Sequence, residues 1–216
     1  MGKRPGYGLT STFLSVEGVV YASFLILDLT GQGGQTVSIK YAGVLLCLAF
    51  ALTGGDRLVS LALALTAGAD WFLLVRGDHY AAGIALFLCV QTVYFLRLRR
   101  AGAGDGWPVR SGLALGLGAG VYALNMASPL NLAAALYFSQ LASNALLAWT
   151  LKGARWRAFA LGLTLFVGCD ICVGLFNVLP AASPLYFPAS IGMWLFYLPS
   201  QVLIALSALP EKEEVK

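Results

Sequence analysis

The sequence predicts an all-α membrane protein, a polytopic bundle of about eight transmembrane helices in a single domain. Hydrophobic residues make up 59% of its 216 residues and charged residues only 11%, whereas a soluble domain carries about 25% charged residues. The apolar residues are gathered in blocks long enough to cross a hydrocarbon core about 30 Å thick at about 1.5 Å per residue. The Lys and Arg residues lie mainly at the ends of these blocks, as they do beside membrane helices.

Short joints separate the apolar blocks and place the helices. We predict helices at residues 11–29, 38–52, 57–75, 80–98, 109–124, 130–151, 158–178 and 187–209. The joints contain turn-forming residues, at 31–34, Gly54-Gly55, Gly77-Asp78, 102–108, Ser128-Pro129, Lys152-Gly153 and 180–184. Blocks this long and uniformly apolar exclude barrel strands, which alternate in polarity. Because Glu17 interrupts the first block, we interpret that block as a retained helix and not as a cleaved signal peptide.

The basic residues are distributed unevenly between the two ends of the predicted bundle. With a cytoplasmic N-terminus, twelve of the fourteen lie on the inner side, and only Lys40 and Arg76 lie on the outer side. Cytoplasmic loops carry such an excess. We therefore predict a multi-pass protein of the cell membrane with both termini in the cytoplasm, in which a transmembrane domain at 1–210 precedes a charged cytoplasmic tail at 211–216. No run mixes basic and aromatic residues on an exposed segment, so nucleic acid is not a predicted partner.

The two halves of the chain show a weak internal similarity. Residues 37–70 align without a gap with residues 137–170, and eight of the 34 aligned pairs are identical. Four helices in each half would form a parallel repeat, related by an axis along the membrane normal. The alignment suggests such a 4+4 internal repeat.

Two aspartates inside the predicted helices are the main candidates for chemistry. Asp70 and Asp170 each follow an arginine of the inner edge, Arg57 or Arg157, by 13 residues, or about 20 Å along a helix. They are therefore expected at matched depth in the outer half of the membrane. Two carboxylates in one low-dielectric cavity oppose each other's ionisation, so that one stays protonated while the other is charged. General acid–base catalysis needs that combination.

A structural role for these aspartates is the alternative. Each carboxyl group can instead form a hydrogen bond across a helix interface or pair with Lys40. Two other acidic residues lie in the first predicted helix: Glu17, whose role is left open, and Asp28, which is near a helix end and is expected to be hydrated.

Other polar residues of the predicted helices suggest a polar cavity at a similar level. They are Gln91, Tyr94, Gln140, Asn144, Tyr197 and Gln201. Each one taken alone fits interhelical hydrogen bonding as well as substrate contact. The Cys169-x-x-Cys172 pair does not predict a metal site, because the only histidine, His79, falls in an outer loop. Glycines at 112, 116 and 120 predict a close helix contact.

Several short segments resemble the YhhN-like lysoplasmalogenases, a family of small eight-helix membrane proteins. The resemblance extends from about Lys40 to Ser207. The segments that carry it are Ser38–Tyr41, Gly68–Leu74, Gly83–Tyr94, Leu165–Asp170 and Phe196–Ser207. This sequence departs from the family pattern where Tyr41 replaces a proline, Gln91 a histidine, Ala69 a glycine and Cys169 a serine.

The resemblance implies hydrolysis of the vinyl ether bond of lysoplasmalogens, without a metal or organic cofactor. Asp70 and Asp170 would be the catalytic acid and base, in an order that the sequence leaves open. Lys40 would hold the lipid phosphate, and Gln91, Tyr94, Asn144, Tyr197 and Gln201 would complete the substrate site. The implied partner is a membrane lipid or lysolipid. The oligomeric state is left open, with a homo-oligomer as one option.

Two other functions compete with the hydrolase. Parallel four-helix halves with acidic residues inside the membrane also fit a small proton-coupled transporter. A non-catalytic lipid-binding protein is the third interpretation, because the amide of Gln91 cannot shuttle protons as an imidazole does.

Overall fold

The computed structural model describes residues 7–31 and 36–210. The predicted tail, Lys3, Arg4 and most of the joint at 31–34 lie outside the described residues. Within them, eight α-helices and one short π-helix are joined by turns, without a strand. The helices are α1 Tyr7–Leu29, α2 Val37–Gly54, α3 Arg57–Asp70 with its π-helical continuation η2 Trp71–Arg76, α4 Tyr80–Arg100, α5 Trp107–Ala123, α6 Pro129–Ala148, α7 Ala154–Val178 and α8 Tyr186–Leu206. The all-α prediction is confirmed, and each predicted boundary lies within four residues of the observed one.

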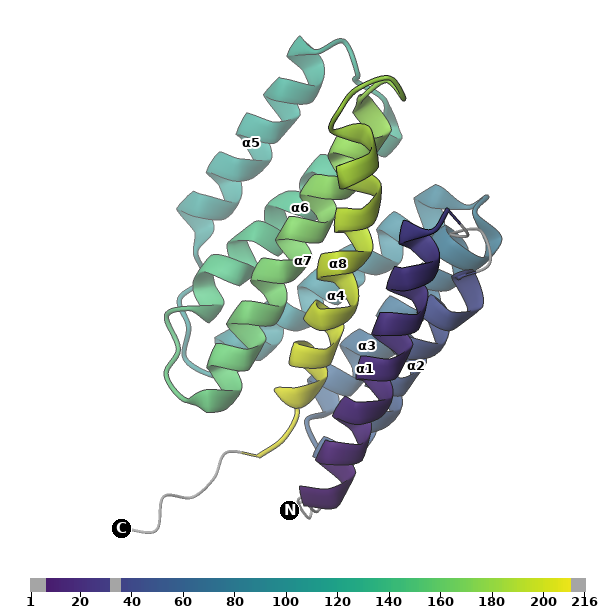
Figure 1. The fold of residues 1–216 in the computed structure, drawn as a ribbon. Helices are drawn as coiled ribbons and strands as arrows, with labels where there is room; N and C mark the ends of the chain where they lie inside the picture. The colour runs from purple at the N-terminus through teal and green to yellow at the C-terminus, as the bar shows by residue number, and fades with distance from the viewer. Residues whose placement is uncertain (1–6, 32–35, 211–216) are drawn as a thin grey trace.

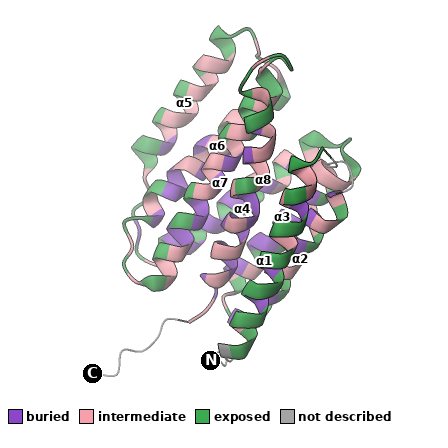
Figure 2. Cartoon of the chain, in the orientation of Figure 1, coloured by how far each residue is buried: buried purple, intermediate pink, exposed green. Residues whose placement is uncertain are grey.

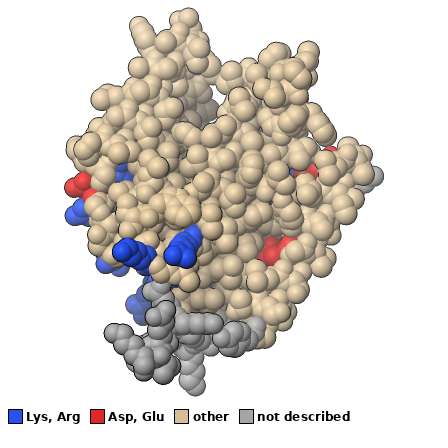
Figure 3. All heavy atoms as spheres, turned by 60° about the vertical axis from the view of Figure 1, so that its left-hand side comes forward, with Lys and Arg blue, Asp and Glu red and all other residues tan. Residues whose placement is uncertain are grey.

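The helices form one elongated bundle. Figure 1 shows them running side by side, with the start of α1 and the end of α8 at the same end. Among the described residues, six segments are long and apolar enough to cross a membrane, namely α1, α2, α3 with η2, α4, α7 and α8. The chain is thus a multi-pass membrane protein. Figure 3 shows Lys and Arg side chains gathered toward the end that carries the termini; the cytoplasmic placement of that end stays a prediction, as does the 4+4 repeat.

Side chains at the helix starts satisfy backbone groups that a helix leaves free. The Asp56 carboxylate accepts hydrogen bonds from the backbone N–H groups of Leu58 and Val59 at the start of α3. The Ser128 hydroxyl accepts one from Asn131 at the start of α6. Such N-caps supply acceptors to the first turn, where no carbonyl of the same helix is in reach.

Pro199 lies inside α8 and has no backbone N–H. The carbonyl of Leu195, four residues earlier, therefore loses its helical donor. The Tyr21 hydroxyl of α1 donates to this carbonyl at 3.1 Å. In a membrane, neighbouring side chains can satisfy backbone groups freed by a proline in this way, so the contact helps to hold α1 against α8.

The buried core lies where α2, α3, α4, α6, α7 and α8 face one another. Figure 2 shows buried residues concentrated along these helices, while α5 is mostly intermediate or exposed. The only buried residue of α5 is Arg110. A Cβ atom added at Gly112, Gly116 or Gly120 would meet no atom within 4 Å. The predicted close contact through these glycines is therefore wrong for the described chain, because that face of α5 has no helix against it.

The close contact occurs instead between α7 and α8. A Cβ atom at Gly162 would lie 2.9 Å from a side-chain carbon of Ile204 and 3.0 Å from the backbone oxygen of Ser200. We expect Gly162→Ala to lower the free energy of unfolding by about 1–3 kcal/mol, because a backbone atom cannot move aside without separating the helices. Thermal unfolding of the detergent-solubilised protein measures this effect.

Gly116→Ala is the matched control, since a Cβ there meets nothing within 4 Å. We expect it to leave the unfolding midpoint unchanged or slightly raised. Equal midpoints for the two variants would show that the α7–α8 contact does not limit stability.

Candidate functional site

Asp70 is buried at the end of α3, where the α-helix widens into the π-helix η2. The Tyr197 hydroxyl of α8 donates to its Oδ2 atom at 2.6 Å. The sequence predicted an uninterrupted helix over 57–75, so the π-helical segment is a correction. Widened turns of this kind occur frequently at functional sites, and this one begins at the residue after Asp70.

Asp170 lies on α7 and is partly exposed. The Tyr137 hydroxyl of α6 interacts with this carboxyl group. Both the hydroxyl and the Oδ2 atom of Asp170 are nonetheless buried without a well-formed hydrogen bond to any described residue. Asp170 therefore retains an unused buried acceptor, in contrast to Asp70.

The two carboxyl groups are close enough to interact electrostatically. The structure thus brings together the two residues that the sequence singled out, one from α3 and one from α7. The 13-residue spacing from Arg57 and Arg157 is α-helical in both cases, so the aspartates lie at similar depth. Beyond the two aspartates, the described residues of these helices are no longer buried: neither 71–76 nor 171–178 contains a buried residue. Figure 3 shows the surface hollowed between two lobes at the end opposite the termini. This is the end toward which α3 and α7 run (Figure 1).

Aromatic rings connect the two aspartate–tyrosine pairs. Phe87 of α4 lies 5.4 Å from Tyr137, Phe166 of α7 lies 5.4 Å from Tyr197, and the two phenylalanine rings are 5.6 Å apart. The four rings pack in tilted and edge-to-face arrangements, as aromatic side chains favour. They form an apolar wall that joins four helices beside the aspartates. Sequence reasoning missed Tyr137 and both phenylalanines, because a lone aromatic residue in an apolar block gives no sign of what it faces.

Of the predicted substrate-binding residues, Tyr197 is the one that contacts Asp70 or Asp170 through a hydrogen bond. Gln201 lies one helical turn after Tyr197 on α8, nearer the end of the bundle that carries the termini. Gln91 lies one helical turn after Phe87 on α4, in the same direction. Gln201 is fully buried and donates to the Ser200 hydroxyl at 3.0 Å. Its Oε1 atom forms no hydrogen bond with a described residue. The hydroxyl of the buried Tyr94 interacts with Thr66 without a well-formed hydrogen bond.

Gln91 and Asn144 belong to a separate buried network. The Asn144 amide donates to the backbone and side-chain oxygens of Gln91, at 2.9 and 3.0 Å. The Arg110 guanidinium donates to the side-chain oxygens of Asn144 and, at 2.6 Å, of Gln140. Arg110, which the sequence placed at the inner surface, is only 4% exposed. This network joins α4, α5 and α6, as interhelical hydrogen bonds do in membrane bundles.

Lys40 lies in the first turn of α2, at the end of the bundle opposite the termini, and its ammonium group is already paired. It contacts the Asp28 carboxylate at 2.8 Å and lies 4.8 Å from the centre of the Trp194 ring. The Trp194 ring in turn packs edge-on against Tyr197 at 5.3 Å. The prediction that Asp28 is hydrated is wrong, because its side chain is only 7% exposed. Because the Asp28 carboxylate already compensates the charge of Lys40, a phosphate would have to compete with that carboxylate for the ammonium group.

A second charged cluster, at the end with the termini, was not recognised in the sequence. The Asp56 carboxylate accepts hydrogen bonds from Arg97 at 3.0 Å and from Arg155 at 2.6 Å. Arg97 also donates to the backbone oxygen of Ser207 at 2.7 Å. The cluster therefore ties together the ends of α3, α4, α7 and α8. The sequence did show one acidic residue, Asp56, among many basic residues at helix ends. It did not indicate that Arg97 and Arg155 are its partners, because the three residues are far apart in the sequence.

The fold and site define a multi-pass membrane protein with two interacting acidic side chains inside its helical bundle. The chain belongs to the YhhN family, whose model matches residues 35–208. This confirms the resemblance found in the sequence. No curated protein and no solved structure matches the chain significantly.

Proposed function

We propose that the protein hydrolyses the vinyl ether bond of a lysoplasmalogen, giving a fatty aldehyde and a glycerophospho-alcohol. The observation that carries the proposal is the proximity of Asp70 and Asp170, each beside a tyrosine hydroxyl, in a chain of the YhhN family. Interacting carboxyl groups differ in protonation, and one can act as an acid while the other acts as a base.

The reaction needs one proton donor and one activated water molecule. A protonated aspartic acid gives its proton to the β carbon of the vinyl ether, which is the double-bond carbon not bonded to oxygen, and the carbon bonded to oxygen becomes an oxocarbenium ion. The second, ionised aspartate takes a proton from water as the water oxygen bonds to that carbon. As the resulting hemiacetal breaks its bond to the glycerol oxygen, that oxygen takes the proton held by the former base. The hemiacetal hydroxyl gives its proton to the former acid, and the aldehyde is released with both aspartates in their starting states. Paired carboxylates serve glycosidases in a similar way.

The surroundings of the aspartates suit this chemistry. The Phe87 and Phe166 rings give an apolar wall for the alkenyl chain, and aromatic faces attract cations such as the oxocarbenium ion. The Tyr197 hydroxyl, which donates to Asp70, favours the ionised form of that carboxyl group. The Tyr137 hydroxyl interacts with Asp170 in the same sense, so either carboxyl group can take either role.

The direct test incubates the purified full-length protein in detergent with a lysoplasmalogen. Aldehyde release and the matching glycerophospho-alcohol are followed by mass spectrometry. The matched control substrate is a 1-acyl lysolipid with the same headgroup and chain length, which has an ester in place of the vinyl ether. We expect aldehyde from the first substrate and no fatty acid from the second. Recovery of both lipids intact would refute the hydrolase, and fatty acid release would show an esterase.

A further inference from the structure

A pocket of about 570 Å³ opens at the end of the bundle that carries the termini. It is framed by the α2–α3 turn, the last turn of α4, the first turn of α7 and the end of α8. This is the end opposite the segments that follow Asp70 and Asp170. The pocket is therefore separate from the proposed catalytic site, and its size falls within the range of small-molecule sites.

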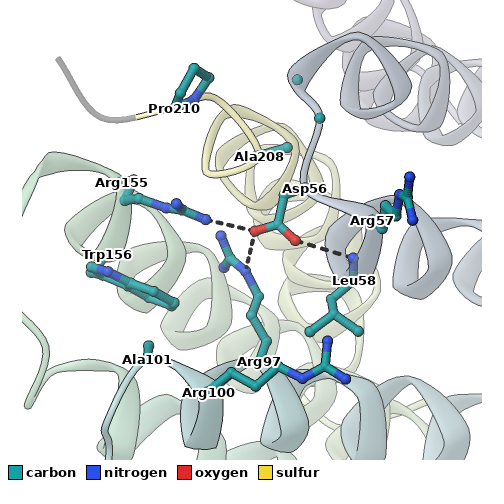
Figure 4. Close-up of a pocket in the computed structure, with 12 residues that line it drawn as sticks. Asp56, Arg57, Leu58, Arg97, Arg100, Ala101, Arg155, Trp156, Ala208 and Pro210 are labelled. Atoms are coloured by element: carbon teal, nitrogen blue, oxygen red, sulfur yellow. Dashed lines mark hydrogen bonds and ion pairs between the residues drawn. The ribbon is translucent and has the colours of Figure 1, made fainter. Parts of the chain in front are cut away.

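The lining of this pocket is strongly basic. Among the described residues, four arginines, Arg57, Arg97, Arg100 and Arg155, line it together with a single carboxylate, that of Asp56. One negative charge against four positive charges leaves an excess of three. Figure 4 shows the Asp56 carboxylate bonded to Arg97 and Arg155, while Arg57 and Arg100 are not joined to it. Two guanidinium groups of the lining thus remain available after the internal ion pairs are formed.

The paired arginines also have unused donors. The Nη1 atom of Arg97 and the Nε atom of Arg155 are buried and form no hydrogen bond with a described residue. Arg97 is only 3% exposed and is packed under the rings of Trp156 and Phe159, at 4.6 and 4.3 Å. A buried charged donor without an acceptor costs free energy. An anion in the pocket would supply acceptors where the protein itself does not.

The chemistry of the lining favours a phosphate group among anions. Every cation of the pocket is an arginine, and the planar guanidinium group matches the oxygen geometry of phosphate in paired hydrogen bonds. The first turn of α7, which contributes Arg155 and Trp156, has no side-chain cap, and free N–H groups at a helix start also attract phosphate. A phosphate carrying more than one charge compensates the excess better than a carboxylate does.

We propose that this pocket binds a phosphate group, whether of free phosphate or of a lipid headgroup in the adjoining leaflet. Both sources present the same oxygens to the arginines. The proposal does not depend on the hydrolase, because the phosphate-binding residues lie at the opposite end of the bundle from Asp70 and Asp170.

The test compares two double variants that remove the same charge. Arg57→Gln with Arg100→Gln removes the two exposed lining arginines that do not bond to Asp56. The control, Arg99→Gln with Arg157→Gln, removes two exposed arginines of the same helix ends that do not line the pocket. Because the net charge changes equally, a non-specific attraction of anions to this surface would fall equally in both.

Binding is measured with two probes. Equilibrium dialysis of radiolabelled inorganic phosphate against the full-length protein in uncharged detergent tests the free source. Native mass spectrometry of protein released from vesicles of phosphatidylcholine with phosphatidic acid tests the lipid source. We expect saturable binding of at least one probe. In the lining variant, the dissociation constant for phosphate should rise at least tenfold, or the fraction of lipid retained should fall at least tenfold. In the control variant, either quantity should change less than twofold.

Phosphate binding without lipid retention identifies a soluble ligand, and the reverse identifies a headgroup; both support the site. Absence of binding to either probe, or an equal loss in the two double variants, would overturn it.

Discussion

Replacing Asp70 or Asp170, the two proposed catalytic residues, by asparagine is expected to lower the rate of aldehyde release by about 10²–10⁴-fold, the contribution typical of general acid–base catalysis. The substitution keeps the size of the side chain and an oxygen acceptor, but an amide cannot give or take the proton. The measurement is the initial rate with saturating lysoplasmalogen for D70N and D170N. The prediction depends on the proposed hydrolase.

The control for this experiment is Asp78→Asn at the end of the bundle opposite the termini. Asp78 is exposed, and hydrogen bonds from Arg76 and His79 lower the pKa of its carboxyl group to about 2. It is therefore a permanently charged carboxylate that takes no part in the site, and D78N should retain the full rate. A D70N or D170N protein that elutes and unfolds like wild type yet keeps full activity would disprove the acid–base mechanism.

Replacing Asp56 by alanine should produce the largest loss of stability among single changes in the charged cluster. The substitution leaves the nearly buried Arg97 without its carboxylate, and breaking a buried ion pair costs about 3–5 kcal/mol. It also removes the N-cap of α3, which contributes about 1 kcal/mol. We expect a fall of at least about 3 kcal/mol, since Asp56 and Arg155 keep some contact with solvent. Thermal or denaturant unfolding in detergent measures it.

Two matched variants separate the causes. Asp56→Asn removes the charge but keeps a good N-cap, so its loss of stability should be about 1 kcal/mol smaller than that of D56A. Asp105→Asn removes the partner of Arg99 in an exposed pair at 3.7 Å, which should cost less than about 1 kcal/mol. If D56A and D105N unfold at the same midpoint, the Asp56 cluster does not hold the helix ends together.

Most of the architecture could be predicted because it depends on local composition. Blocks such as 80–98 and 158–178 are apolar over a membrane thickness and are bounded by turn formers, so their helices follow from the sequence. The π-helix after Asp70 could not be predicted. It depends on how the chain packs after the core ends and not on a recognisable residue pattern.

The candidate site was predictable in part. Acidic residues within apolar blocks are costly and therefore conspicuous, and matched spacing from Arg57 and Arg157 placed Asp70 and Asp170 at one level. Their partners were not predictable to the same degree. Asn144 and Gln91 looked equivalent to Tyr197 as polar residues of a helix, but only Tyr197 points at an aspartate, whereas the amides bond to each other and to Arg110.

The sequence by itself determined that this chain crosses a membrane as a helical bundle, about where its helices end, and that Asp70 and Asp170 lie within the apolar segments. These features follow from the free energy of placing each segment in lipid or water, which is a property of the segment alone. Only the tertiary structure decided which side chains meet: Tyr197 with Asp70, Lys40 with Asp28, and Arg97 and Arg155 with Asp56. Such pairs join helices far apart in the chain, and the rotation of each helix about its axis, which packing sets, determines the partners.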